Sequence, residues 1–252
     1  MLHPPHIPST LLKHPLLDQL KVELEVMRLD QVHPTVSGNK FFKLKYNLAE
    51  ALKQNHRQVL TFGGAYSNHI YATAAAAKLL GLHSIGIIRG EVSDEKNPTL
   101  KSAMDAGMIL KGLSRELYRD KTHSDFIDQL RQEFGEFYLI PEGGTNALAI
   151  QGTTEILSHS TAHFSHLATP IGTGATFAGL ANSILPQQEL LGISALKGED
   201  IQEEIKQLLQ TQGIQPQGSI SIWTQYHHGG YAKWTSELIE FIHWFWESFG
   251  IP

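Results

Sequence analysis

The sequence predicts an α/β protein with two lobes, each an open, twisted, mostly parallel sheet flanked by helices. Short apolar runs alternate with helical patterns along most of the 252 residues, and this alternation is typical of parallel sheets covered by helices. Glycine-bearing loops follow several runs, at the strand ends where open α/β sheets bind ligands. No low-complexity linker or short repeat divides the chain, so joined lobes are favoured over separate domains.

In the first half, alternating apolar and charged side chains over Val22–Leu29 predict a strand with one exposed face. Periodicity then predicts helices and strands in turn. The expected elements are a helix from about Gly38 to Asn55, strand Val59–Phe62, helix Asn68–Leu80, strand Ser84–Ile88, helix Thr99–Ala106, strand Met108–Leu110, helix Asp125–Phe134 and strand Phe137–Ile140.

The second half repeats the scheme and ends in an aromatic helix. Its expected elements are helix Ala147–Leu157, strand Leu167–Ile171, helix Thr176–Leu185, strand Leu190–Leu196, helix Ile201–Gln210, strand Ser219–Trp223 and helix Ser236–Phe249.

Composition limits the class of partner. The chain is 41% hydrophobic and 18% charged, which allows a sizeable core, and its net charge of −5 gives a nucleic-acid partner no support. The absence of cysteine excludes disulfides, thiolate metal sites and a catalytic thiol. The proline-containing start does not have the pattern of a secretory signal, and no run reaches the roughly 18 apolar residues of a membrane helix. We expect a cytoplasmic protein with no membrane partner.

Lys40 and Lys43 lie three residues apart at a predicted helix start, and Ser37 is placed to cap that helix. A lysine held against an apolar wall loses solvation, so its pKa falls and it can attack an aldehyde. On these residues alone, a surface helix with solvated lysines is the simpler interpretation. The apolar stripe that would anchor the helix is Phe41, Leu44, Leu48 and Leu52.

Gly63–Asn68 joins a strand to an alanine-rich helix. The glycines allow a ligand ring to approach the backbone, and Ser67 and Asn68 offer a hydroxyl and an amide. Ser67 can equally cap the helix, and one hydroxyl can serve both purposes.

Two further glycine-bearing loops precede helices. The first loop is Gly172-Thr173-Gly174-Ala175-Thr176, and its backbone N–H groups can bind a lone phosphate. A plain tight turn accounts for these residues equally well. Phe177 stands where the dinucleotide fingerprint needs a small residue, so that fingerprint fails. The second loop, Pro141–Asn146, is by itself a turn with Thr145 or Asn146 as a cap.

The 14 histidines do not show the spacing of metal ligands, so no metal site is expected. His227 and His228 are adjacent and would point to opposite sides of an extended chain. The simpler interpretation is that these histidines face solvent or the core.

Taken in order, these motifs resemble the pyridoxal-phosphate enzymes of fold type II that include 1-aminocyclopropane-1-carboxylate (ACC) deaminase and D-cysteine desulfhydrase, within the tryptophan synthase beta-like superfamily. The resemblance runs through nearly the whole chain. The motifs that carry it are Ser-Gly-Asn-Lys at 37–40, Gly-Gly-Ala-Tyr-Ser-Asn-His at 63–69, Pro-Glu-Gly-Gly-Thr-Asn at 141–146, Gly-Thr-Gly-Ala-Thr at 172–176 and Gly-Gly-Tyr at 229–231.

The resemblance implies pyridoxal 5'-phosphate as cofactor and assigns site residues. Lys40 resembles the lysine that forms the Schiff base and moves the substrate's α-proton, and Lys43 resembles the second lysine, which binds the cofactor phosphate. Further cofactor-binding positions are Asn68, at the 3-hydroxyl, and the phosphate cradle Gly172, Thr173, Gly174, Ala175 and Thr176. Ser67, as a nucleophile or proton relay, and Tyr231 join Lys40 as the implied catalytic residues.

The resemblance also implies a division of the chain. Residues 1–45 and 143–252 are expected to form a larger cofactor-binding lobe, with 46–142 as a smaller inserted lobe that carries the Ser67–Asn68 loop. Phe42 replaces the usual basic residue between the two lysines, which affects packing. The family pattern continues beyond Pro252, into a segment with a further active-site tyrosine.

The expected function is a lyase or deaminase acting on a small amino acid. It would be most like D-cysteine desulfhydrase, whose α,β-elimination gives pyruvate, ammonia and sulfide, or ACC deaminase. His69 after Ser67-Asn68 favours the desulfhydrase. The alternatives are a C-terminally truncated, catalytically impaired relative that still binds cofactor and, disfavoured by Phe177, a nicotinamide-dependent enzyme. The aromatic face of the last helix needs a cover, so a homodimer or low solubility is expected.

Overall fold

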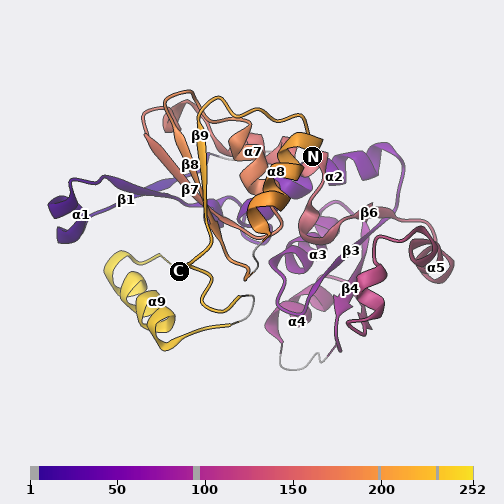
Figure 1. The fold of residues 1–252 in the computed structure, drawn as a ribbon. Coiled ribbons are helices and arrows are strands. Elements are labelled where there is room, and N and C mark those ends of the chain that lie inside the picture. The colour runs from indigo at the N-terminus through magenta and orange to yellow at the C-terminus, as the bar shows by residue number, and fades with distance from the viewer. Residues whose placement is uncertain (1–5, 93–96, 198–199, 231–232, 252) are drawn as a thin grey trace. The chain divides into compact units, whose positions relative to one another are not determined.

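A computed structural model describes residues 6–92, 97–197, 200–230 and 233–251 (Figure 1). The described chain separates into two compact units. Unit 1 contains Leu29–Ile156, and unit 2 contains Pro8–Arg28 and the residues from Leu157 onward. The predicted division differs, because it assigns residues 29–45 and 143–156 to the larger lobe together with residues 157–252. That lobe division stays a prediction.

The sheet of unit 1 has four parallel strands in the order β5-β4-β3-β6. Strand β3 is central, and its Val59 pairs with Ser84 of β4 on one side and Tyr138 of β6 on the other. The strands are β3 (Gln58–Gly64), β4 (His83–Arg89), β5 (Met108–Leu113) and β6 (Tyr138–Ile140).

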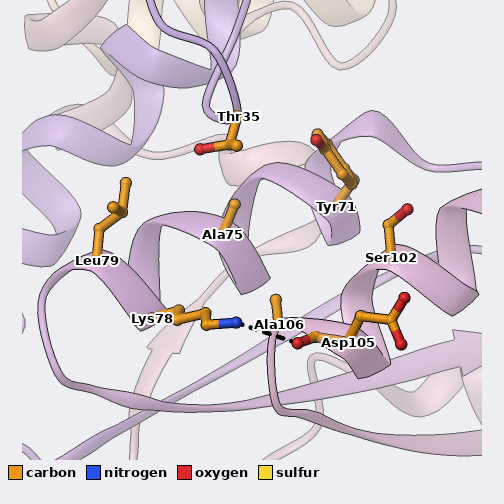
Figure 2. Close-up of a pocket in the computed structure, with 8 residues that line it drawn as sticks. All are labelled: Thr35, Tyr71, Ala75, Lys78, Leu79, Ser102, Asp105 and Ala106. Atoms are coloured by element: carbon orange, nitrogen blue, oxygen red, sulfur yellow. Dashed lines mark hydrogen bonds between the residues drawn. The ribbon is translucent and has the colours of Figure 1, made fainter.

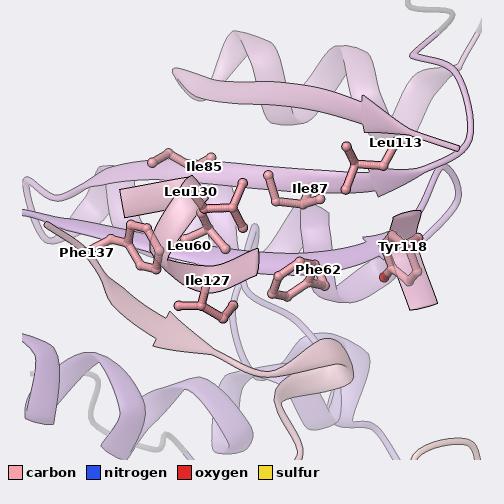
Figure 3. Close-up of a cluster of buried hydrophobic side chains, with 9 residues drawn as sticks. All are labelled: Leu60, Phe62, Ile85, Ile87, Leu113, Tyr118, Ile127, Leu130 and Phe137. Atoms are coloured by element: carbon pink, nitrogen blue, oxygen red, sulfur yellow. The ribbon is translucent and has the colours of Figure 1, made fainter. Parts of the chain in front are cut away.

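Helices cover both faces of this sheet. On one face, Ile127 and Leu130 of α5 (Ser124–Phe134) pack on Leu60 and Ile85 of the strands (Figure 3). On the other face, α3 (Asn68–Leu79) and α4 (Pro98–Asp105) contact β4 and β5, and the run of alanines in α3 lets the helix approach closely. The 3₁₀ turn η2 (Leu117–Asp120) lies between β5 and α5, and η1 (Leu29–Gln31) lies at the start of the unit.

Helix α2 (Asn39–Lys53) packs along α6 (Ala147–Thr153) at short range. A Cβ added at Gly152 would lie 2.0 Å from the carbonyl oxygen of Phe42, so only glycine permits this approach. The turns η3 (Glu142–Gly144) and η4 (Thr154–Ile156) flank α6. This packing fixes the helix that carries Lys40 and Lys43.

Unit 2 has a parallel sheet in the order β7-β8-β9 and a separate antiparallel pair, β1 with β2. Gly192 of β8 permits close packing, since an added Cβ would lie 2.6 Å from the Phe177 ring. The elements are β1 (Ser9–Leu12), α1 (Pro15–Leu20), β2 (Leu24–Met27), η5 (His159–Thr161), β7 (His166–Ile171), α7 (Ala175–Ala181), β8 (Glu189–Ser194), α8 (Ile201–Thr211), β9 (Ser219–Trp223) and α9 (Ser236–Phe249).

The predicted fold class is confirmed: two parallel sheets flanked by helices follow the predicted order of elements. The prediction that Ser37 caps α2 is wrong. Gly38 occupies the cap position at φ +68°, a conformation that suits glycine, and no side chain caps the helix there. Within the described part of the chain, no helix is long and apolar enough to cross a bilayer.

Candidate functional site

Lys40 and Lys43 lie on the first turns of α2, where the sequence placed them. The interpretation of this stretch as a surface helix with solvated lysines is wrong for Lys43: its side chain is buried, with 2% of the residue exposed. Burial lowers the pKa of Lys40 to about 8. Burial and the neighbouring charge of Lys40 lower the pKa of Lys43 to about 6. Both amines therefore give up a proton more readily than an exposed lysine does.

The buried amine of Lys43 is held by the glycine turn after β6. Its Nζ donates to the carbonyl oxygen of Gly143 at 3.0 Å. Gly143 and Gly144 adopt φ values of +64° and +71°, so the turn requires two glycines in succession. A Cβ at Gly144 would lie 3.1 Å from Cε1 of His69 and 3.6 Å from Cβ of Lys43. The motif at 141–146 thus lies against both Lys43 and His69.

His69 is buried at the start of α3, with 1% of the residue exposed. The Thr61 hydroxyl donates to the carbonyl oxygen of Ile140 at 2.9 Å, so it must accept from Nε2–H of His69 at 2.8 Å. This assignment leaves Nδ1 as a bare acceptor, and among the described residues it has no hydrogen-bond partner. Burial, followed by the charges of Lys40 and Lys43, lowers the pKa of His69 well below its usual value.

Ser67 caps α3, as one interpretation of its motif predicted. Its Oγ accepts from the backbone N–H of His69 at 3.2 Å and of Ile70 at 3.4 Å. The hydroxyl proton stays available for donation, because both cap bonds use the oxygen as acceptor. Asn68, the next residue, has an exposed side chain.

A reciprocal amide pair ties α2 to the start of α6. Nδ2 of Asn47 donates to Oδ1 of Asn146 at 3.1 Å, and Nδ2 of Asn146 donates back at 2.6 Å. Oδ1 of Asn146 also accepts from N–H of Ala149, which confirms the predicted cap. Asn47 additionally donates to the carbonyl oxygen of Lys43 at 2.9 Å, so the pair reaches the lysine-bearing turn.

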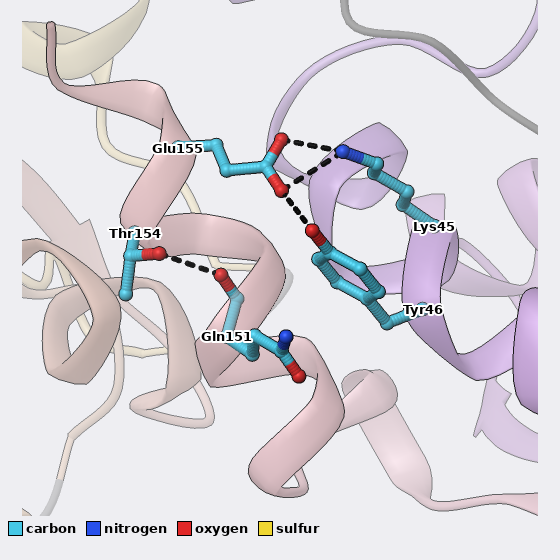
Figure 4. A network of polar contacts seen from close by, with 5 residues as sticks. All are labelled: Lys45, Tyr46, Gln151, Thr154 and Glu155. Atoms are coloured by element: carbon cyan, nitrogen blue, oxygen red, sulfur yellow. Dashed lines mark hydrogen bonds and ion pairs between the residues drawn. The ribbon is translucent and has the colours of Figure 1, made fainter.

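A second tie joins α2 to η4 (Figure 4). Nζ of Lys45 donates to both carboxylate oxygens of Glu155, at 2.8 and 2.6 Å, and the Tyr46 hydroxyl donates to the same carboxylate. Hydrogen bonding to Glu155 raises the pKa of Tyr46. Lys45 and Tyr46 therefore serve to hold the helix, while Lys40 and Lys43 lie near the buried His69.

The 172–176 loop lies in unit 2 and runs from the end of β7 into the first turn of α7. Gly172 and Thr173 are exposed, whereas Gly174, Ala175 and Thr176 are buried. Gly174 adopts φ +84°, and a Cβ there would lie 2.7 Å from Cδ1 of Ile205 on α8. The backbone of this loop is therefore tightly specified.

Unit 1 contains three of the motifs that carry the resemblance, at 37–40, 63–69 and 141–146. His69, which follows Ser67 and Asn68, is close enough to feel the charges of Lys40 and Lys43. Tyr231, the other expected catalytic residue, lies outside the described residues. The hydrogen bond from His69 to Thr61 was missed by sequence reasoning, because nothing in the spacing of positions 61 and 69 marks them as partners.

The chain is similar to known proteins over nearly its whole length. A family profile described as "Pyridoxal-phosphate dependent enzyme" matches residues 3–252. D-cysteine desulfhydrase of Yersinia pestis (strain Pestoides F) is 30% identical over 249 residues, which cover 90% of this chain and 75% of that protein. D-cysteine desulfhydrase of Serratia proteamaculans (strain 568) is 29% identical over 237 residues, 84% of this chain and 70% of that protein.

Solved structures show the same architecture. A structure described as an ACC deaminase homologue superposes with a TM-score of 0.81 at 26% identity, over 100% of this chain and 80% of that chain. An O-acetylserine dependent cystathionine beta-synthase from Helicobacter pylori superposes with a TM-score of 0.63 at 12% identity, over 98% and 82% of the two chains. The second likeness concerns the fold alone.

Proposed function

Because the chain belongs to the family of pyridoxal-phosphate dependent enzymes, we propose that it is a lyase or deaminase acting on a small amino acid, most like D-cysteine desulfhydrase. The basic cluster of half-buried Lys40 with buried Lys43 and His69, the last two packed against the 143–144 turn, carries this proposal.

The residues present fit pyridoxal 5'-phosphate chemically. An aldehyde needs an amine that loses its proton near neutrality, and a pKa of about 8 gives Lys40 this property. A phosphate needs cationic and N–H donors, and Lys43 offers an ammonium group whose protonation an anion would favour. The unpartnered Nδ1 of His69 adds a buried polar atom beside the lysines.

We assign the cofactor-binding roles accordingly. Lys40 would bond covalently to the cofactor, Lys43 and the backbone of 172–176 would bind its phosphate, and Asn68 would bind its 3-hydroxyl. The cofactor, when bound, supplies an electron sink for the negative charge that develops at the substrate's α-carbon.

The catalytic roles fall to Lys40, Ser67 and Tyr231. The Lys40 amine removes the α-proton, since its pKa lies close to neutrality, where a general base works best. The Ser67 hydroxyl holds or relays a proton next to the substrate carboxylate, and its position at the N-terminus of α3 favours an anion there. Tyr231, which lies outside the described residues, would act on the substrate side of the cofactor ring.

Substrate assays separate the two relatives' chemistries. Elimination from D-cysteine with one water yields pyruvate, ammonia and sulfide, whereas ring opening of ACC yields ammonia and no sulfide. We expect sulfide release from D-cysteine, measured against L-cysteine and ACC under the same conditions. Ammonia from ACC without sulfide from D-cysteine would replace the desulfhydrase assignment with the deaminase.

Cofactor attachment tests the proposal directly. Reconstituted protein should absorb in the visible, bleach on borohydride treatment and carry the reduced pyridoxyl group on Lys40 in peptide maps. Lys40→Ala should abolish this attachment, while Lys53→Ala, an exposed position on the same helix, should not. A colourless protein after reconstitution would refute the proposal. Normal colour with background turnover of every amino acid tested would support the catalytically impaired alternative.

A further inference from the structure

The segment that leads into Lys40 is a closed loop within unit 1. N–H of Gly38 donates to the carbonyl oxygen of Leu29 at 2.8 Å, which joins the two ends of the loop just before α2 begins. Inside the loop, Val32 and Val36 are buried. The conformation of residues 33–36 therefore determines where the chain enters the helix that carries Lys40.

His33 organises this loop through one ring nitrogen. Its Nδ1 accepts the backbone N–H of Thr35 at 3.2 Å and of Val36 at 3.1 Å. Because both bonds need a lone pair on Nδ1, the neutral ring carries its proton on Nε2. The contact has the pattern of an Asx turn, in which a side-chain acceptor binds the N–H two residues later.

The His33 ring also contacts the helix itself. It stacks on Phe41 with ring centroids 6.2 Å apart and an interplanar angle of 30°. Phe41 is buried and directly follows Lys40. The same side chain thus binds the turn through its nitrogen and α2 through its ring face.

The outer side of the turn borders a groove. Thr35 faces α3 across a cavity volume of about 380 Å³ (Figure 2). The groove is lined by Thr35, Tyr71, Ala75, Lys78, Leu79, Ser102, Asp105 and Ala106. On the inner side of the turn, His33 Nδ1 accepts the backbone N–H of Thr35 and lies 3.4 Å from the Thr35 hydroxyl, so Thr35 is held from the side opposite the groove.

We propose that His33 is a positioning residue for Lys40: its Nδ1 fixes the 33–36 turn and thereby the entry of the chain into α2. This role rests on the proposed function of Lys40. It requires the acceptor nitrogen and not merely an aromatic ring at position 33.

Two substitutions separate the acceptor from the ring. His33→Asn keeps an acceptor for the N–H groups of Thr35 and Val36 but removes the stack on Phe41, and His33→Phe does the reverse. His14→Ala is the matched control, because His14 Nδ1 accepts N–H of Leu16 at 3.2 Å in unit 2. Two measurements are made: amide hydrogen exchange in the cofactor-free protein, and the rate of borohydride trapping of pyridoxal phosphate on Lys40.

For His33→Phe we expect faster exchange at Val36 and trapping on Lys40 slowed about tenfold, the effect of losing two modest hydrogen bonds. In His33→Asn, exchange at Val36 and trapping on Lys40 should both stay near the wild-type rates. His14→Ala should change neither rate. Equal trapping in wild type and His33→Phe would overturn the proposal, as would a His33→Asn protein as slow as His33→Phe. If the wild-type protein is not trapped on Lys40 at all, the proposed function fails, and the exchange data still show whether Nδ1 restrains the turn.

Discussion

The two lysines of α2 lie close enough for the charge of one to disfavour protonation of the other. Lys40, the less perturbed of the two, has a pKa of about 8 because of burial. A lowered pKa means that the reactive neutral amine becomes dominant as the pH rises through 8, whereas an ordinary lysine reaches that point near pH 10.4.

Competitive acetylation of the cofactor-free protein tests this difference. Modification of Lys40, followed by mass spectrometry, should rise about tenfold per pH unit below 8 and level off above it. N-acetyl-lysine amide in the same tube serves as the reference and should keep rising beyond pH 9. A Lys40 profile parallel to that reference would contradict the lowered pKa.

Ser67 combines a structural and a chemical role that substitution can separate. Ser67→Ala removes the cap of α3 and the hydroxyl together, so we expect a loss of about 1 kcal/mol in the free energy of unfolding and a loss of turnover. Ser67→Asn keeps a capping oxygen without the hydroxyl, so stability should stay near wild type while turnover is lost. Urea unfolding and steady-state assays measure the two effects, and full activity in Ser67→Asn would exclude a role for the hydroxyl.

The histidines show what single-residue reasoning misses. Nδ1 of His14, His33 and His227 each accepts the N–H two residues later, at 3.2, 3.2 and 2.9 Å. The sequence led us to expect histidines facing solvent or the core, because a histidine has no strong turn propensity that would mark it as a cap. Ser67 was predicted correctly as a cap because serine does have that propensity.

At the scale of elements, the close approach of α2 and α6 determines where the lysines lie. Gly152→Ala would place a Cβ 2.0 Å from the carbonyl oxygen of Phe42, so one helix must move. We expect the free energy of unfolding to fall by about 3 kcal/mol and trapping on Lys40 to slow. Gln151→Ala, at the exposed neighbouring position, should change stability by less than about 0.5 kcal/mol. Wild-type stability in Gly152→Ala would mean that the two helices are not packed so closely.

Element order was predictable from the sequence because apolar periodicity reports burial directly. The ends of the helices were less predictable. The helix expected over Ala147–Leu157 ends as α6 at Thr153 and tightens into η4. The carboxylate of Glu155, in η4, pairs with Lys45 of α2, a partner 110 positions away that no local pattern reveals.

At the scale of the whole molecule, α9 exposes apolar side chains. In the described part of the chain, none of its residues is buried, and Phe241 and Trp246 are each 53% exposed. Such a surface favours self-association, so we expect a homodimer. Light scattering should show a mass that falls toward the monomer in Phe241→Glu and stays dimeric in Glu240→Gln. A wild-type monomer at every concentration tested would contradict the expectation.

The residues assigned to the cofactor are divided between the units: Lys40, Lys43 and Asn68 belong to unit 1 and the 172–176 loop to unit 2. The sequence could indicate these residues only through their resemblance to a family, because the long-range pairing of loops leaves no periodic signal. If all of them bind one molecule, pyridoxal phosphate must slow amide exchange in both units, as any ligand that binds the native state does. Protection is therefore expected near residues 40–43 and at 173–176, and Gly172→Pro should weaken it in both places by disturbing the loop. Cofactor that protects unit 1 alone would restrict the site to the lysine cluster and remove the 172–176 loop from it.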